Sequence, residues 1–150
     1  MPLNIRKKED CHLDLLAFGE CMVRLSPPGH GRIEFSKTLE VDVGGGEFNV
    51  AYACARLGLR TGFISKLPDN PMARIILNHA RAVGMDVSNV LLEPYDGVGR
   101  KSRVGLNFTE VGTGVRPSVT IYDRGHSAIS QLWPEEIDFD AIFSRRVRWL

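Results

Sequence analysis

The sequence predicts an α/β fold in which short buried strands alternate with amphipathic helices. Three observations lead to this prediction: an apolar run at 13–18, a strand-glycine-helix pattern at 39–57, and a strand followed by a second helix at 61–83. A helix between two strands returns the chain to a parallel neighbour, so repeated units of this kind build a layered sheet.

The first half of the chain contains four strand patterns and two helix patterns. The expected strands lie at 13–18, 22–25, 39–43 and 61–66. The expected helices lie at 47–57 and 70–83. Gly58 and Gly84 end these helices, whereas Asn70 caps the second helix and Pro71 opens it.

The second half predicts a hairpin and an unfinished strand. Strand patterns at 102–109 and 118–122 flank a Gly112-Thr113-Gly114 turn with no helix between them, so we expect an antiparallel hairpin that projects as a lid. A short helix is expected at 134–143. The apolar run at 147–150 has the character of a strand that continues, which predicts a part of a longer domain with an incomplete sheet.

Composition excludes several classes of protein. The 43% hydrophobic and 25% charged residues are typical of an ordinary globular domain, which a chain of 150 residues can form. Nineteen basic residues are balanced by eighteen acidic ones and are mostly scattered, so we expect no nucleic-acid partner. No stretch approaches the ~20 apolar residues that span a bilayer, so we expect no membrane partner.

The cysteines and histidines indicate neither a disulfide framework nor a metal site. The three cysteines form no CxxC pair, and the four histidines lack the spacing of metal ligands. The first residues are basic but are not followed by the apolar segment of a signal peptide. We therefore expect a cytoplasmic protein without a structural metal.

The triple glycine Gly44-Gly45-Gly46 is the strongest local signal for a ligand. Glycines between a strand and a helix let backbone N–H groups approach an anion or a polyhydroxylated molecule. The pattern is neither a P-loop nor GxGxxG, because Asn49 stands in place of the last glycine. The alternative is a tight turn that needs a positive φ and binds nothing, with Asn49 holding that turn in place.

These residues carry a resemblance to a known family. Gly44-Gly45-Gly46-Glu47-Phe48-Asn49-Val50-Ala51, followed by Ala55-Arg56-Leu57-Gly58, resembles the N-terminal signature of the PfkB/ribokinase family of carbohydrate kinases. Segments 16–20 and 62–66 resemble two strands of that family, and Tyr122-Asp123-Arg124 resembles its sugar-contact segment on the lid.

The resemblance covers about 13–150 and implies a fold. It implies the N-terminal part of a ribokinase-like three-layer sandwich with a small β lid, built from about 19–43 and 98–125. Residues 1–12 are then a leader, which we expect to be mobile. The C-terminal part that binds the nucleotide is expected to lie outside these 150 residues.

The Gly-Glu opening and the Tyr-x-Arg segment are most similar to those of 2-keto-3-deoxygluconate kinases, which phosphorylate an acid sugar. This resemblance implies that Gly45 and Asn49 contact sugar oxygens, that Tyr122 donates or stacks from the lid, and that Phe108 lies on the sugar-facing wall of the lid. Arg124 suits the substrate carboxylate, because a guanidinium pairs with a carboxylate through two parallel hydrogen bonds. The alternative for Arg124 is a solvated charge on the hairpin.

The resemblance also implies what the chain lacks. The complete enzyme would use ATP, magnesium and a catalytic aspartate in a glycine-alanine-glycine-aspartate motif, which the sequence does not contain. We therefore expect no catalytic residue, no bound cofactor and no kinase activity of the isolated chain. Met22 and Arg24 stand where kinases of neutral pentoses have Asn and Asp, which disfavours ribose and adenosine. The expected ligand is a sugar or sugar acid, and a homo-oligomer through the lid is a further expectation.

Two other functions stay open at this stage. One is a non-catalytic module that binds a sugar acid or a partner protein, for which a closed sheet would be the sign. The other is a dinucleotide-binding domain, which needs an acidic residue at the end of the following strand, where the chain has Lys66.

Overall fold

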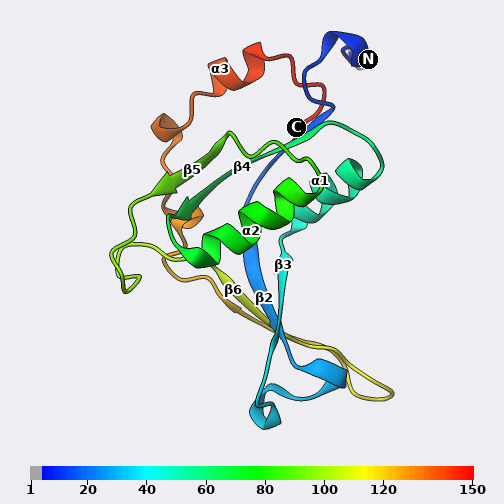
Figure 1. Cartoon of the computed structure of the whole chain (residues 1–150), viewed down its shortest axis with the longest axis vertical. Helices are drawn as coiled ribbons and strands as arrows, with labels where there is room; N and C mark the ends of the chain where they lie inside the picture. Colours follow the sequence, from blue (N-terminus) through cyan, green and yellow to red (C-terminus); the bar gives the residue numbers. More distant parts are fainter. Residues whose placement is uncertain (1–4) are drawn as a thin grey trace.

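A computed structural model describes residues 5–150 of the chain (Figure 1). The strands are β1 (Leu15–Phe18), β2 (Met22–Ser26), β3 (Glu40–Gly44), β4 (Thr61–Pro68), β5 (Val90–Glu93), β6 (Leu106–Glu110) and β7 (Val119–Asp123). The α-helices are α1 (Gly46–Arg56), α2 (Pro71–Ala82) and α3 (Phe139–Ser144). Single turns of 3-10 helix are η1 (Lys8–Asp10), η2 (Pro28–His30), η3 (Ile33–Phe35), η4 (Ala128–Gln131) and η5 (Pro134–Glu136).

The main sheet is parallel and has the order β1-β4-β5. Each connection crosses over through a helix, which confirms the α/β prediction. Strand β4 lies in the middle and is buried along its whole length, so both of its faces need cover. The short strand β5 was not predicted, because only four residues separate the Ser88-Asn89 turn from Pro94.

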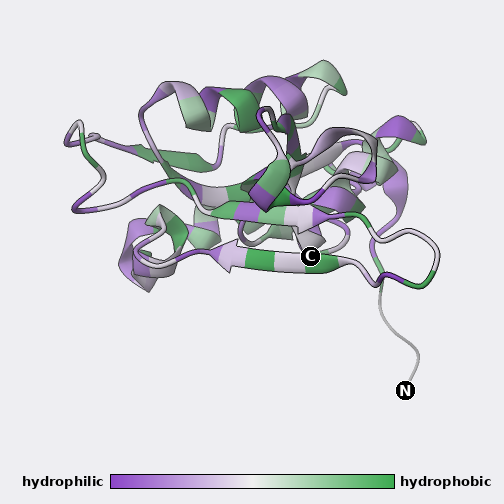
Figure 2. Cartoon of the chain, turned by 90° about the horizontal axis from the view of Figure 1, so that it is seen from below, coloured by the Kyte–Doolittle hydropathy of each residue, from purple (hydrophilic) through white to green (hydrophobic). Residues whose placement is uncertain are grey.

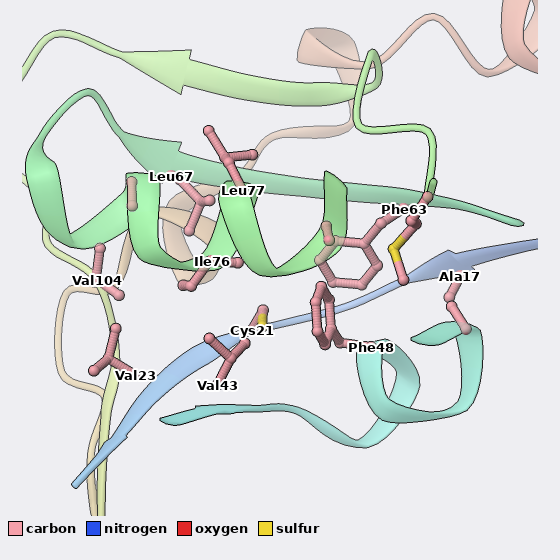
Figure 3. Close-up of a cluster of buried hydrophobic side chains, with 14 residues drawn as sticks. Ala17, Cys21, Val23, Val43, Phe48, Phe63, Leu67, Ile76, Leu77 and Val104 are labelled. Atoms are coloured by element: carbon pink, nitrogen blue, oxygen red, sulfur yellow. The ribbon is translucent and has the colours of Figure 1, made fainter. Parts of the chain in front are cut away.

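Apolar side chains cover the main sheet on both faces and define three layers. On one face Phe48 of α1 meets Phe63 of β4 edge to face, with ring centroids 5.1 Å apart (Figure 3). On the other face Leu16 and Ile64 pack with residues of the C-terminal segment, among them Ile142. The sheet therefore has one helical layer from α1 and α2 and a second layer from the C-terminal segment.

The second sheet is the lid, with the order β3-β2-β6-β7 (Figure 1). Strands β2 and β6 are parallel, and the two outer pairs are antiparallel, as expected for the hairpin of β6 and β7. The register aligns residues in rows across the four strands. An apolar row contains Val41, Leu25, Phe108 and Ile121. The next row, which is polar and faces the opposite side, contains Asp42, Arg24, Asn107 and Tyr122.

The apolar and polar faces of the lid have different surroundings. Close to the main sheet the apolar face is buried in the core, where Val23 and Val43 lie against the cluster that includes Ile76 of α2. Farther out the apolar face has no such cover, and Ile121 is 54% exposed. Hydrophobic and hydrophilic residues alternate along the strands (Figure 2).

The helix boundaries follow local rules except near the C-terminus. The Asn70 side chain accepts a hydrogen bond from the N–H of Ala73 at 3.0 Å and Pro71 opens α2, while Gly58 and Gly84 have positive φ, all as predicted. The helix expected at 134–143 is instead divided into η5 and α3. Asp138 caps α3 by accepting a hydrogen bond from the N–H of Ala141, and a cap residue is not itself helical.

Both terminal segments contact the domain. Arg60, in the loop between α1 and β4, donates hydrogen bonds to the carbonyl groups of Lys8 and Cys11 at the end of the leader. The mobility of the leader stays a prediction. Residues 1–4 of that leader lie outside the described residues. The apolar run at 147–150 runs parallel to β1, with a bridge between Leu13 and Val147.

Candidate functional site

A polar cavity lies where the lid meets the main sheet. Its volume is about 290 Å³. The lining comes from the β1–β2 connection, the start of α1 and the end of β7: Gly19, Glu20, Met22, Gly46, Glu47, Tyr122 and Arg124. Met22 and Tyr122 belong to the lid, whereas Gly19 and Glu20 follow β1 of the main sheet and Gly46 and Glu47 begin α1, so a molecule in the cavity would lie at the junction of the lid with the rest of the domain.

The N-terminus of α1 provides one wall of the cavity. Gly45 occupies the cap position and has no side chain to accept hydrogen bonds from the first N–H groups of the helix. Gly46 and Glu47, the first two helical residues, line the cavity. The free N–H groups and the positive end of the helix dipole favour an oxygen-rich or anionic ligand at this wall.

Gly45 is required for a different reason from the one considered in the sequence analysis. Its φ is 178°, which is extended backbone, so the turn needs no positive φ. A Cβ atom at Gly45 would instead overlap the carbonyl oxygen of Glu20. Glycine is therefore needed so that the start of α1 can approach the β1–β2 connection closely.

Arg124 and Glu20 form an ion pair across the cavity. The Glu20 Oε2 atom accepts a hydrogen bond from Arg124 Nε at 2.6 Å and lies 2.5 Å from Arg124 Nη2. The Arg124 side chain is 53% exposed, whereas the Glu20 side chain is only 9% exposed. The guanidinium carbon lies 6.0 Å from the centre of the Tyr122 ring, at the outer limit of a cation–π contact.

The cavity contains a second carboxylate. Glu47 extends from the first turn of α1 toward Gly19, where an added Cβ would lie only 2.6 Å from Glu47 Oε2. Two carboxylates and one guanidinium therefore line the cavity. Carboxylates accept hydrogen bonds from sugar hydroxyls, and the guanidinium can donate to a carboxylate or keto oxygen.

The predicted site residues occupy different places in the structure. Tyr122 and Arg124 line the cavity, and Gly45 lies directly before the lining residue Gly46. Asn49 is exposed one helical turn farther along α1 and is not part of the lining. Phe108 belongs to the apolar row, so it faces the side of the lid opposite to Tyr122.

Two charged lining residues were missed by the sequence analysis. Glu20 belongs to a segment that resembles the family, and its position directly after a buried strand and a glycine was the available signal. Glu47 lies within the glycine signature itself and was treated as part of the motif. A charge in the first helical turn next to a glycine turn is the pattern that could have identified it.

Asp123, between the two lid residues of the cavity, has a structural partner. Arg103 donates hydrogen bonds to both of its carboxylate oxygens, and this pairing lowers the pKa of Asp123. Tyr122 and Asp123 point to opposite faces because they are consecutive in β7. Asp123 is thus used to hold the lid rather than to line the cavity.

The described residues do not provide a metal site. Within residues 5–150, no group of three or more His, Cys, Asp or Glu side chains is arranged to hold a metal ion. The same part of the chain has no helix that is long and apolar enough to cross a membrane. We assign no residue of the chain to magnesium or to a nucleotide.

Fold and cavity together define an α/β domain with a β-sheet lid beside a polar cavity. The model of the family described as pfkB family carbohydrate kinase matches residues 12–142. The chain therefore belongs to the pfkB family of carbohydrate kinases, which excludes the dinucleotide-binding alternative.

Individual relatives agree with this membership. A 2-dehydro-3-deoxygalactonokinase of Haloferax volcanii is 39% identical over 129 residues, which are 86% of this chain and 38% of that protein. A 5-dehydro-2-deoxygluconokinase of Shouchella clausii is 32% identical over 97% of this chain and 43% of that protein. The crystal structure of a 2-dehydro-3-deoxygluconokinase of Thermotoga maritima superimposes with a TM-score of 0.83 at 38% identity, covering 92% of this chain and 40% of that one. The chain spans about 40% of the length of these relatives.

Proposed function

We propose that the chain forms the sugar-binding side of an ATP-dependent kinase whose substrate is a keto-deoxy sugar acid, with 2-keto-3-deoxygluconate (2-dehydro-3-deoxygluconate) as the preferred compound. The single observation that carries the proposal is the guanidinium of Arg124 at the wall of a polar cavity under the lid. The three relatives are named for sugars that carry a dehydro and a deoxy position, which agrees with this substrate class.

The proposed role of the chain is to position the acceptor sugar. The carboxylate would lie against Arg124, while hydroxyl and keto groups would meet the N-terminus of α1, Glu47 and Tyr122. Holding an acceptor in the reactive geometry can contribute up to about 7–11 kcal/mol of barrier reduction once the second reactant is bound. ATP, its magnesium ion and the aspartate base would be supplied by other parts of the complete enzyme. The expected location of that enzyme is the cytoplasm.

A change of Arg124 tests the substrate class. We expect Arg124→Leu to weaken binding of 2-keto-3-deoxygluconate by about 1.5–3 kcal/mol, the value of hydrogen bonds to a charged group. Arg124→Lys should restore only part of the loss, because an ammonium group cannot form two parallel hydrogen bonds. Calorimetric titration of the chain measures both effects.

A neutral sugar and a second arginine serve as controls. 3-Deoxyfructose has a hydroxymethyl group in place of the carboxylate, so its affinity should hardly change in either variant. Arg74 of α2 pairs with Asp69 at 3.1 Å and does not line the cavity, and Arg74→Leu should change acid binding by less than about 0.5 kcal/mol. Equal losses for the acid and the neutral sugar in Arg124→Leu would contradict the proposal.

We also propose that a second copy of the chain covers the outer part of the apolar face of the lid. Val41, Val119 and Ile121 on this face are 53%, 45% and 54% exposed. An exposed apolar sheet face is a recurrent place of association, because pairing removes that surface from water. Phe108 would then belong to the contact between two lids rather than to the sugar cavity.

A further inference from the structure

We propose that Glu20 is a positioning residue, which fixes the guanidinium of Arg124 so that one edge of it is presented to the ligand. A guanidinium has a side edge, formed by Nε and Nη2, and an end edge, formed by Nη1 and Nη2. Glu20 Oε2 contacts Nε at 2.6 Å and Nη2 at 2.5 Å, so it occupies the side edge. The inference concerns the ion pair itself, and its consequence for binding rests on the proposed function.

The end edge of Arg124 is available to a ligand. Among residues 5–150, Glu20 is the only hydrogen-bond partner of the Arg124 side chain, and Nη1 has none. The Tyr122 ring lies 6.0 Å from the guanidinium carbon and gives it a weak additional attraction. A carboxylate that binds the end edge through two hydrogen bonds would therefore find the fork already oriented, which reduces the conformational entropy lost on binding.

The carboxylate of Glu20 is buried, which is unfavourable for a charged group. Its side chain is 9% exposed, and its Oε1 atom is buried without a hydrogen-bond partner among the described residues. A buried carboxylate oxygen without a partner is destabilising, so Arg124 is the group that makes this arrangement tolerable. An ordinary surface ion pair would have both side chains in water.

Gly105 makes the room for Glu20. A Cβ atom at position 105 would lie 2.5 Å from Glu20 Oε1, which would have to move, and 3.1 Å from Met22 Cγ, which is a tight contact. Gly105 thus leaves space for the Glu20 carboxylate, and that carboxylate orients the guanidinium of Arg124. Glu47 is the matched comparison, since it is a carboxylate in the same cavity that forms no hydrogen bond or ion pair with Arg124 among residues 5–150.

The ion pair can be tested on the chain without any sugar. Nuclear magnetic resonance measures how fast the Nε–H proton of Arg124 exchanges with water, with the exposed Arg24 as internal reference. We expect exchange at Arg124 to be at least about tenfold slower than at Arg24, because Glu20 Oε2 accepts that hydrogen. Glu20→Ala should abolish the difference, and Glu47→Ala should leave it intact. Equal rates at both arginines in the unmodified chain would overturn the proposal.

Binding then tests the consequence. We expect Glu20→Ala to raise the Kd of 2-keto-3-deoxygluconate about tenfold, with a smaller rise for Glu20→Gln, which keeps an acceptor oxygen, and less than about a twofold change for 3-deoxyfructose. Gly105→Ala should reproduce the loss, because its Cβ displaces the Glu20 carboxylate, and should add nothing in the Glu20→Ala background. Glu47→Ala removes an acceptor for a sugar hydroxyl rather than a partner of Arg124, so it should weaken binding of the acid and of 3-deoxyfructose alike.

The outcomes separate this inference from the proposed function. Unchanged or tighter acid binding in Glu20→Ala would mean that Glu20 competes with the ligand for Arg124, and it would overturn the positioning role. If the unmodified chain binds no sugar acid, the proposed substrate is wrong, and the exchange rates alone decide whether Glu20 fixes Arg124.

Discussion

At the scale of single residues, Gly45 shows that a turn can require glycine for lack of space rather than for a special backbone conformation. Its backbone is extended, and a Cβ atom added to it would overlap the carbonyl oxygen of Glu20. That oxygen belongs to the backbone and cannot rotate away as a side chain could. We expect Gly45→Ala to lower the free energy of unfolding by about 1–3 kcal/mol, the usual cost of overpacking. Urea unfolding measures this change.

Gly44 provides the control for Gly45. It neighbours Gly45 in the triple glycine, its φ is not positive, and an added Cβ would meet no atom within 4 Å. Gly44→Ala should therefore change stability by less than about 0.5 kcal/mol. If both variants lose the same stability, the close approach of α1 to the β1–β2 connection is not what requires glycine at position 45.

The sequence identified residues that line the cavity only where one segment supplies both the motif and the geometry. Tyr122 and Arg124 were assigned from one short segment, and both line the cavity. Phe108 was assigned without knowledge of the strand register, and a shift of one residue moves a side chain to the other face of a sheet. Glu20 acquires its role from Arg124, which is distant in sequence, so no local pattern could reveal the ion pair.

At the scale of elements, the two faces of β7 lead to a prediction about association. Ile121 lies in the apolar row, whereas its neighbour Thr120 points to the opposite face, where it is paired with Thr109. If a second copy covers the apolar face, Ile121→Lys should convert dimers into monomers, because it would bury an unpaired charge in the contact. Sedimentation velocity measures the state of association.

Thr120→Lys is the matched control for this experiment. It introduces the same charge one residue away, on the exposed polar face, and should leave the dimer intact. A chain that sediments as a monomer before any substitution would refute association through the lid.

Strands and helices were predictable to the extent that their signals are local. Asn70 and Pro71 identified the start of α2 correctly, because a cap and a first-turn proline act within a few residues. Lys66 is a contrasting case, since its burial depends on Glu93 of β5 and Glu136 of η5, whose carboxylates lie 3.3 Å and 2.6 Å from its Nζ atom. Burial disfavours its charged form, but the Glu136 hydrogen bond and the charge of Glu93 prevail and raise the pKa of Lys66.

At the scale of the whole molecule, the Asp14–Arg60 pair makes stability depend on pH. Asp14 is 3% exposed, and hydrogen bonds from the Arg60 side chain lower its pKa to about 2. A carboxylate whose pKa is depressed by folding stabilises the native state above its unfolded pKa of about 3.9. That contribution is lost as the pH falls from about 4 through the folded pKa.

We expect this pair to account for about 1–2 kcal/mol of the acid-dependent loss of stability, reduced from the full linkage value because Arg60 is 45% exposed. Urea unfolding between pH 6 and pH 2 measures the dependence, since this range covers the unfolded pKa and reaches the folded one. Asp14→Asn should be less stable at pH 6, and its free energy of unfolding should fall less steeply as the pH decreases. Parallel curves for the two proteins would show that Asp14 does not contribute.

The pairing of β2 with β6 has a consequence for the order in which the molecule folds. More than half of the chain lies between these parallel neighbours, including α1, β4, α2 and β5. Contacts between residues so distant in sequence form slowly. The intervening chain must lose conformational entropy before the hydrogen bonds and packing of the pair can stabilise it. The main sheet and its helices are therefore expected to assemble first. The pairing of β2 with β6, and with it the cavity that holds Arg124, is expected to form only after them.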